Sequence, residues 1–287
     1  MAGHLTAFGC ALIWGTTFVS TKFLLENFSP LEVLFFRNLI AYLVMAALCP
    51  RRLVVQNKKQ ELLFILAGIS GITLYYLFEN VALAYSTASN VGVIVAAAPF
   101  FSVLLTSWAC KEEKPGVPFF LGFLIAMTGI FLISFNGFSV LKLNPLGDLL
   151  AFLAALIWGV YSLAVKKLNA GGYPIIPLTR RIFFYGLLFM IPPLFLMDFR
   201  PLPPEFREPA NLFNILFLGL GASAAAFILW NKAIQILGVG RSSVYIYLIP
   251  VVSIIFSVIF LKERITALAV LGALLVLLGL FISQGRR

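Results

Sequence analysis

The chain has 287 residues, of which 61% are hydrophobic and 11% are charged, and its mean hydropathy is +1.03. Soluble domains carry about 25% charged residues, so this composition excludes a water-soluble globular protein. The formal net charge of +10 comes mainly from Lys and Arg residues in short segments beside apolar runs, which favours a membrane surface over nucleic acid as the partner.

Apolar runs of about twenty residues recur along the whole chain, which is the length that a helix needs to cross about 30 Å of hydrocarbon. The short alternating segments of a transmembrane barrel are not present in the sequence. We therefore predict an all-α integral membrane protein with ten transmembrane helices. The predicted helices are Leu5–Leu25, Leu31–Cys49, Leu62–Ala84, Thr87–Trp108, Val117–Phe135, Gly147–Lys166, Ile175–Met197, Leu212–Ile234, Ser242–Leu261 and Thr266–Ser283.

The second half of the chain repeats the first. The sequence ALIWG at residues 11–15 returns at residues 155–159, and other residues align with the same offset or with small shifts of it. The aligned pairs include Arg37 and Arg181, Asn80 and Asn231, Pro99 and Pro250, Gly122 and Gly272, and Gly129 and Gly279. We predict that residues 1–140 and 141–287 are two copies of one five-helix unit.

An odd number of helices in each copy places the second copy upside down in the membrane. Inverted repeats of this kind are typical of transporters that bind their substrate near the middle of the membrane, between the two halves. If the N-terminus is cytoplasmic, twelve Lys and Arg residues fall on the inner side and six on the outer side. The positive-inside rule therefore predicts that both termini are cytoplasmic.

Glu79 is the one carboxylate deep inside a predicted helix. An ionised carboxylate in hydrocarbon costs about 2.5–3.5 kcal/mol or more, so Glu79 is expected to face protein or water. One interpretation is a proton carrier for coupled transport. The other is a structural acid paired with a basic group or with Tyr76 and Tyr75, three and four residues earlier. A single acid without a second acid or a histidine provides only one group for proton transfer, which favours the structural interpretation.

Two further pairs of aligned residues are candidates for function. Arg37 and Arg181 lie about two turns inside their helices, where an arginine that faces a cavity would bind a carboxylate or phosphate through two N–H groups. The alternative, favoured for either arginine alone, is that the side chain extends to nearby headgroups. Pro99 and Pro250 interrupt the fourth and ninth helices, and such paired breaks indicate either a gate or ordinary helix packing.

Aromatic and amide side chains could form the walls of the site. Trp14 and Trp158 occupy equivalent positions in the middle of their helices and are the better candidates for a cavity wall, and Tyr76 is a further candidate for substrate binding. Most other aromatic residues are expected in the core or at the membrane interfaces. Asn80 and Asn231 could bind substrate or hold helices together.

The sequence offers no chemistry of other kinds. It has no phosphate-binding loop of the G-x-x-x-x-G-K-[ST] type, one histidine and three scattered cysteines. We expect no catalytic residues, no metal site, no cofactor and no nucleic acid partner, and hence no enzyme. The expected partners are a small-molecule substrate, the lipid bilayer and, if Glu79 carries protons, protons.

These features together resemble the EamA-type branch of the drug/metabolite transporter superfamily, whose members have ten helices. The resemblance extends over both halves of the chain. The residues that carry it are the ALIWG sequence of each half, Arg37 and Arg181, the run from Glu79 to Asn90 before Pro99, and the Lys–Glu pairs at residues 111–112 and 262–263. The second half departs from the first with Trp230 at the position of Glu79 and Arg241 at that of Asn90.

The resemblance implies a transporter of amino acids, nucleosides or other metabolites, often an exporter, in a bacterial inner membrane. We predict a secondary active transporter of a small metabolite that works by alternating access. An amino acid or a related anion or zwitterion would suit the arginines and the aromatic residues. The alternative is a passive facilitator or channel for small solutes, which would share the fold without accumulating its substrate.

Overall fold

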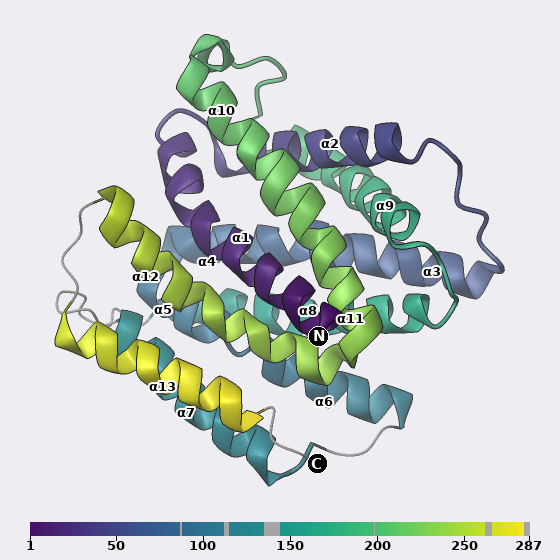
Figure 1. Ribbon diagram of the computed structural model, residues 1–287. Helices are drawn as coiled ribbons and strands as arrows, with labels where there is room; N and C mark the ends of the chain where they lie inside the picture. The colour runs from purple at the N-terminus through teal and green to yellow at the C-terminus, as the bar shows by residue number, and fades with distance from the viewer. Residues whose placement is uncertain (87, 112–114, 135–143, 198, 262–265, 284–287) are drawn as a thin grey trace.

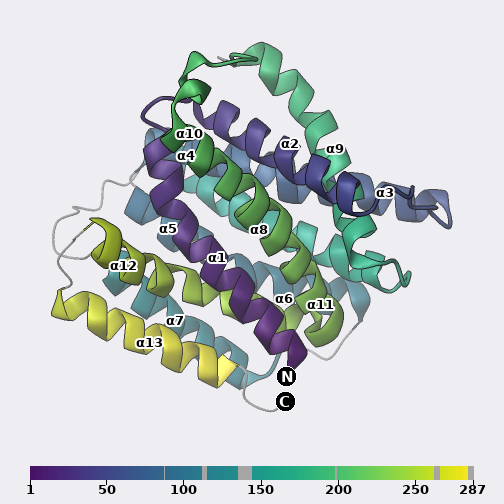
Figure 2. The same ribbon diagram turned by 45° about the horizontal axis from the view of Figure 1, so that its top comes forward.

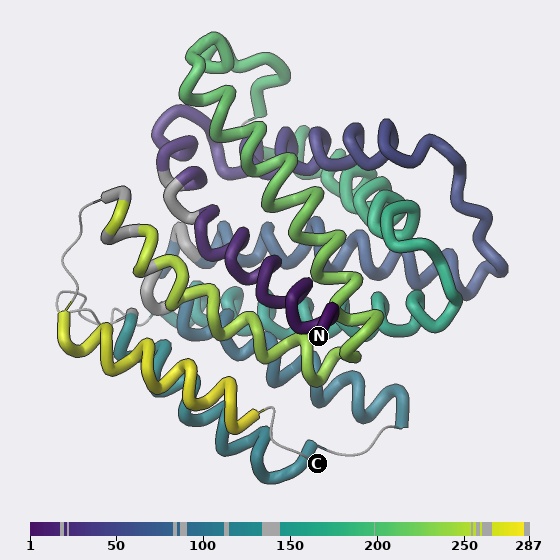
Figure 3. The backbone as a smooth tube through the Cα atoms, viewed as in Figure 1, coloured from purple at the N-terminus to yellow at the C-terminus, as the bar shows by residue number. Residues whose placement is uncertain are grey.

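A computed structural model gives the fold of the chain, and the part that it describes consists of helices and connecting segments without a strand (Figure 1). The described residues are 1–86, 88–111, 115–134, 144–197, 199–261 and 266–283, and Figure 3 follows the course of the backbone. Of the predicted features, Lys22, Asn90, Glu112 and the Lys262–Glu263 pair lie outside the residues whose side chains are described.

The helical elements follow each other in the order in which the sequence predicts them. In residues 1–134 they are α1 (Ala2–Leu24), α2 (Pro30–Leu48), α3 (Lys58–Ala67), η1 (Gly68–Leu74), α4 (Tyr75–Tyr85), α5 (Ala88–Val95), α6 (Ala98–Cys110) and α7 (Val117–Ser134). From residue 145 they are α8 (Pro145–Asn169), α9 (Ile175–Leu196), η2 (Pro204–Arg207), α10 (Pro209–Phe217), η3 (Leu218–Ala225), α11 (Ala226–Ser243), η4 (Val244–Tyr247), α12 (Leu248–Leu261) and α13 (Ala267–Ser283).

Each predicted helix overlaps with described helical residues, so the all-α membrane fold is confirmed. Within the described residues, six helical stretches are long and apolar enough to cross a membrane. These stretches are Pro30–Leu48, Lys58–Ala82, Val91–Ala109, Pro145–Asn169, Ile175–Leu196 and Pro209–Ser253. The last of them contains a bend at Gly238, whose φ of 77° is a conformation that favours glycine. The number of ten crossings stays a prediction.

A capping box fixes the start of α2. The Ser29 side chain accepts a hydrogen bond from the Glu32 amide at 3.2 Å, and Glu32 Oε2 accepts one from the Ser29 amide at 2.8 Å. Glu32 Oε1 also accepts hydrogen bonds from the backbone amide and Nε of Arg200, at 2.9 and 2.8 Å. Glu32 is 1% exposed, so one buried carboxylate joins the start of α2 to the segment between α9 and α10.

Glu32→Gln is expected to lower the free energy of unfolding by about 2 kcal/mol, because hydrogen bonds to a charged group contribute about 1.5–3 kcal/mol. Thermal unfolding of the purified protein in detergent measures the effect. Glu205→Gln is the matched control, since Glu205 makes an ion pair with the same Arg200 at a more exposed place. Equal melting temperatures for the two variants would contradict the role of Glu32.

Two π-helical segments occupy equivalent places in the two halves. η1 and η3 align with the same shift that aligns Asn80 with Asn231, and each forms the middle of a longer helix. η1 packs against α9, and η3 packs against α2. Gly68 allows η1 to pack closely against α9, since a Cβ there would lie 2.7 Å from the backbone nitrogen of Gly186. π-Helical segments are frequent at functional sites, so both are candidate hinges.

α7 and α13 lie side by side along one edge of the molecule in both views (Figures 1 and 2). Glycines form the contact between them. A Cβ on Gly129 would lie 2.5 Å from the Gly272 carbonyl oxygen, and a Cβ on Gly279 would lie 2.5 Å from the Gly122 carbonyl oxygen. The predicted glycine pairs therefore form the contact between α7 and α13, with the two backbones in close approach.

Candidate transport site

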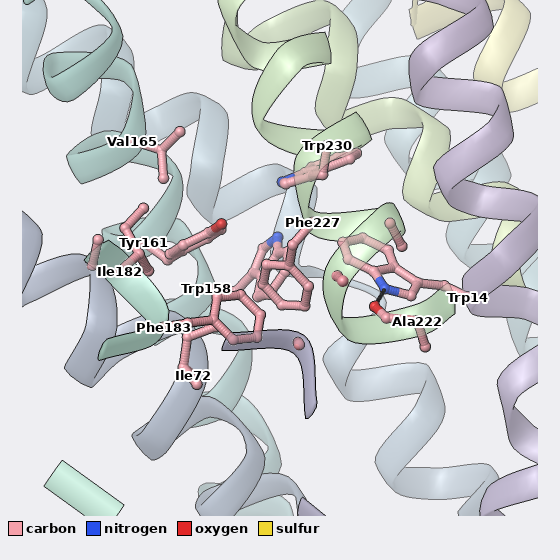
Figure 4. Close-up of a cluster of buried hydrophobic side chains, with 14 of the residues drawn as sticks. Trp14, Ile72, Trp158, Tyr161, Val165, Ile182, Phe183, Ala222, Phe227 and Trp230 are labelled. Carbon is pink, nitrogen blue, oxygen red and sulfur yellow. Dashed lines mark hydrogen bonds between the residues drawn. The ribbon is translucent and has the colours of Figure 1, made fainter. Parts of the chain in front are cut away.

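Aromatic side chains from α1, α8 and α11 meet in the middle of the molecule (Figure 4). The ring of Trp14 lies 5.7 Å from that of Trp158, 5.5 Å from that of Trp230 and 5.4 Å from that of Phe227, measured between centroids. Tyr161 lies 5.0 Å from Trp158. These five residues form what we call the aromatic cluster. Trp14 belongs to the first half of the sequence and the other four belong to the second, so the cluster joins residues that are far apart in the chain.

The Trp–Gly sequence of each half has a packing explanation. Trp14 Nε1 donates a hydrogen bond to the Ala222 carbonyl oxygen at 3.0 Å, which fixes its ring in the aromatic cluster. A Cβ on Gly15 would lie 2.5 Å from Val252 Cβ of α12, and one on Gly159 would lie 3.0 Å from the Phe101 backbone of α6. In each half the tryptophan therefore faces the aromatic cluster, and the glycine allows a neighbouring helix, α12 or α6, to pack closely against the other side.

Two indole N–H groups of the aromatic cluster have no hydrogen-bond partner among the described residues. They belong to Trp158, which is 4% exposed, and to Trp230, which is 1% exposed. The two indole rings lie 6.2 Å apart between centroids, and the Trp158 ring lies 5.0 Å from that of Tyr161 (Figure 4). Buried donors are usually satisfied, so unpaired donors call for an explanation, and one explanation is a ligand that accepts hydrogen bonds.

Arg37 brings a buried positive charge to this region. The residue is 7% exposed, and its Nε donates a hydrogen bond to Ser223 Oγ of η3 at 2.8 Å. Its guanidinium carbon lies 5.4 Å from the ring centroid of Tyr76, a cation–π distance. No other hydrogen bond joins the guanidinium group to the described residues, so most of its five N–H donors are available for an anion.

Glu79 lies on α4, one helical turn after Tyr75 and on the same side of the helix. The Tyr75 hydroxyl group donates a hydrogen bond to Glu79 Oε1 at 3.2 Å. The Tyr75 ring in turn lies 4.9 Å from that of Trp158. The Tyr75 ring also lies 5.0 Å from that of Tyr76, which contacts Arg37. We call the aromatic cluster together with Tyr75, Tyr76, Glu79 and Arg37 the central site.

The two predicted asparagines differ in their surroundings. Asn231 is fully buried, accepts a hydrogen bond from the Tyr161 hydroxyl group at 2.8 Å and donates one to Thr179 Oγ1 at 3.0 Å. Both ends of its amide group are therefore used to join α8, α9 and α11. Asn80 is partly buried on α4 and makes no hydrogen bond with a described residue.

Arg181 lies away from the central site. Its guanidinium group makes a bidentate ion pair with Glu61 of α3, with N–O distances of 2.7 to 3.0 Å, and donates to the Leu53 carbonyl oxygen at 3.3 Å. Tyr185 donates a further hydrogen bond to Glu61. Arg37 and Arg181 are thus equivalent in sequence, but only Arg37 lies beside the aromatic residues in the centre.

Both predicted prolines lie just after a break in a helix. Pro99 is the second residue of α6 and follows the turn at residues 96–97. Pro250 is the third residue of α12 and follows η4. Each proline therefore lies in the first turn of an α-helix, where its missing N–H group removes no intrahelical hydrogen bond.

The structure adds two contacts that the sequence did not single out. Ser223 binds Arg37 across the boundary between the halves, and Phe227 fills the middle of the aromatic cluster. Trp230 could have been found from the alignment of the halves, because it stands at the position of Glu79. No sequence pattern marks Ser223 as a partner of Arg37.

Comparison with known proteins agrees with this architecture. The EamA-like transporter family matches residues 1–135 and 145–284. A protein of Archaeoglobus fulgidus named "Uncharacterized transporter" is 26% identical over 99% of this chain and 98% of its own length. A protein of Streptantibioticus cattleyicolor named "Probable terminal-alkyne amino-acid exporter" is 26% identical over 95% of this chain and 90% of its own length.

A solved protein structure has the same fold, with a TM-score of 0.80 over 98% of this chain and 96% of its own. Its sequence identity of 19% supports the fold alone. The family match covers nearly the whole chain and includes every residue of the central site. The protein is therefore a membrane transporter and belongs to the EamA-like transporter family.

Proposed function

We propose that the protein is a secondary active transporter that carries an amino acid, or a related anion or zwitterion, by alternating access between two inverted five-helix halves. The observation that carries this proposal is the central site, which places Arg37 and Glu79 beside aromatic rings contributed by both halves. A site at such a junction would be exposed to one side of the membrane or the other as the halves exchange conformations.

Reciprocal packing supports the proposal of two related halves, residues 1–140 and 141–287. α1 packs against α11 and α12, while its counterpart α8 packs against α4 and α6. α2 packs against η3, while its counterpart α9 packs against η1. Pairs of this kind are expected when each half supplies the same elements to a common interface, as inverted repeats do.

The groups of the central site favour a substrate with a carboxylate. The guanidinium group of Arg37 can bind a carboxylate through two N–H groups. The unpaired N–H groups of Trp158 and Trp230 offer two further donors to an oxygen atom. Glu79 and the rings of Tyr75 and Tyr76 would favour an ammonium group. The name of the Streptantibioticus relative, an amino-acid exporter, supports the same class of substrate.

Opening of the site requires movement at its ends and in its broken helices. The Arg181–Glu61 ion pair closes α3 onto α9 at one end. Pro99 and Pro250 stand at breaks where α6 and α12 could pivot, and η1 and η3 provide further irregular segments. We assign gating to these elements, and substrate binding to Trp14, Tyr76, Trp158 and Arg37. Asn231 then serves to hold helices together, and Asn80 is a neighbour of Glu79 on α4.

The positive-inside rule supports an orientation with both termini in the cytoplasm. In that orientation the α2–α3 turn, with Arg51 and Arg52, is cytoplasmic, and the α9–α10 connection, with Arg200, is outside. The inner membrane of a bacterium is the proposed location, and relatives of the chain occur in bacteria such as Bacillus subtilis.

Transport into vesicles tests the proposed function. The purified protein is reconstituted in vesicles, and labelled amino acids and other small metabolites are screened with and without an imposed proton gradient. The proposal predicts that at least one amino acid or related anion accumulates above its external concentration when the gradient is present. Equilibration of every transported solute, without accumulation, would instead indicate a passive facilitator.

Glu79→Gln tests whether protons are the coupling ion. The amide cannot release or take up a proton, so the variant is expected to bind substrate as the wild type does while losing the dependence of transport on the proton gradient. The measurement is substrate binding and gradient-driven uptake in the same preparation, with Tyr75→Phe as a control that removes the hydrogen bond and keeps the carboxylate. Unchanged proton dependence in Glu79→Gln would remove Glu79 from the coupling mechanism.

A further inference from the structure

A hollow of about 700 Å³ lies at the end of α2, away from the central site. Its walls come from the α2–α3 turn, the start of α9 and the face of α11. The lining residues are Leu48, Cys49, Arg51, Arg52, Leu53, Val54, Pro174, Ile175, Ile176, Pro177, Ile228, Leu229 and Lys232. None of the residues of the central site is among them.

The floor of the hollow is apolar and its charged groups all have the same sign. Leucine, isoleucine and proline side chains make up most of the lining, and the charged lining residues are Arg51, Arg52 and Lys232. Among the described residues none of these three makes an ion pair. Lys232 donates a hydrogen bond to the neutral Gln235 at 2.8 Å. The hollow therefore combines an apolar floor with three positive charges that have no ion-pair partner in the part of the chain that the structure describes.

A fourth basic residue, Arg180, fixes the turn beside this hollow. Arg180 donates hydrogen bonds to the carbonyl oxygens of Cys49 and Arg51, the latter at 2.8 Å. These bonds fix the turn after α2, and the side chains of Arg51 and Arg52 are exposed beyond it. The arrangement holds two cationic side chains at one rim of the hollow.

The position of the hollow matches the boundary between hydrocarbon and headgroups. Arg51 and Arg52 follow the end of the apolar helix α2 after two intervening residues, and Leu48 at the end of this helix is exposed. A soluble anion would use only the charged rim, and a neutral lipid only the apolar floor. A molecule with a phosphate group and acyl chains would use both, and basic pockets between membrane helices bind such headgroups.

We propose that this hollow is a binding site for an anionic glycerophospholipid. The phosphate group lies against Arg51, Arg52 and Lys232, and an acyl chain lies on the floor formed by Ile176, Ile228 and Leu229. The site does not depend on the substrate of the transporter. Because Leu53 of the rim also accepts a hydrogen bond from Arg181, the bound lipid is expected to stabilise the α3–α9 end of the molecule.

The test uses the full-length protein in detergent micelles. Bound phosphatidylglycerol is counted by native mass spectrometry, and the melting temperature is followed as phosphatidylglycerol or phosphatidylcholine is added. The variant Arg51→Gln/Arg52→Gln is compared with Lys58→Gln/Lys59→Gln, which removes two charges that are also exposed, from the start of α3. Each basic residue near an anionic lipid changes affinity about five-fold, so the first variant is expected to bind phosphatidylglycerol about thirty-fold more weakly.

The expected pattern is a stabilising effect of phosphatidylglycerol that is lost in Arg51→Gln/Arg52→Gln, kept in Lys58→Gln/Lys59→Gln and kept in Arg51→Lys/Arg52→Lys. Ile228→Trp, which fills the floor without changing the charge, is expected to weaken binding as well. Equal binding by Arg51→Gln/Arg52→Gln and the wild type would overturn the proposal. Stabilisation by inorganic phosphate or glycerol 3-phosphate as strong as that by the lipid would also overturn it, in favour of a soluble anion.

Discussion

Arg37→Gln is expected to reduce transport of the substrate by about 100-fold. Truncating one partner of a buried, hydrogen-bonded charge pair costs about 2–5 kcal/mol, and 100-fold corresponds to about 2.7 kcal/mol. The loss is large because Arg37 is the one positive charge in the central site as the structure describes it. Initial rates of uptake in reconstituted vesicles measure the effect, together with substrate binding, which is expected to weaken to a similar degree.

Two further variants show whether the effect belongs to the position. Arg37→Lys keeps the charge and loses the planar group, so partial transport is expected. Arg181→Gln removes the sequence-equivalent arginine, which makes an ion pair with Glu61 away from the central site. This variant is expected to change the rate of transport while leaving substrate affinity near that of the wild type. A similar loss of affinity in both glutamine variants would contradict the assignment of binding to Arg37.

The double substitution Gly129→Ala/Gly272→Ala is expected to lower the free energy of unfolding by about 3 kcal/mol. Each added Cβ would meet a backbone atom of the facing helix at about 2.5 Å, and overpacking of a tight contact costs about 1–3 kcal/mol per site. Backbone atoms cannot move aside as a flexible side chain can, so α7 and α13 must separate. A fall in the melting temperature in detergent, with reduced folded yield, is the expected result.

The matched control for this pair is Gly9→Ala/Gly92→Ala. A Cβ on Gly9 would lie 3.7 Å from Leu229 Cδ1, and one on Gly92 has no atom within 4 Å. Because alanine favours helices over glycine by up to about 1 kcal/mol, the control is expected to be as stable as the wild type or slightly more stable. Equal destabilisation by both double substitutions would mean that the α7–α13 contact is not the cause.

Much of the fold follows from patterns that depend only on local sequence. Length and hydropathy of the apolar runs indicate the helices, and the return of ALIWG indicates the repeat. Glycines that lie seven residues apart in α7 and in α13 indicate a close helix contact. The sequence does not say, however, that Gly129 faces Gly272 and that Gly122 faces Gly279. Trp14 and Trp158 occupy equivalent mid-helix positions in the repeat, which also indicates that they lie near the centre of the molecule.

The surroundings of individual side chains could not be predicted in this way. Arg37 and Arg181 are equivalent in the alignment, yet one binds Ser223 and the other binds Glu61, which lies in the first turn of α3. Asn231 is likewise occupied by Tyr161 and Thr179 from two other helices. Contacts between distant segments depend on how the helices pack, and local periodicity carries no information about them.

The central claim is that two inverted halves alternate around a common site. It is tested most directly by determining on which side of the membrane two equivalent connections lie. Val54 between α2 and α3 is 84% exposed, and Leu202 between α9 and α10 is 87% exposed. Each is replaced by cysteine in a chain whose Cys10, Cys49 and Cys110 are changed to alanine, and intact cells are treated with a membrane-impermeant maleimide. Inverted halves predict labelling at position 202 alone in intact cells and at both positions after the cells are opened. Labelling of both positions from the same side would contradict the inverted arrangement and, with it, the proposed mechanism.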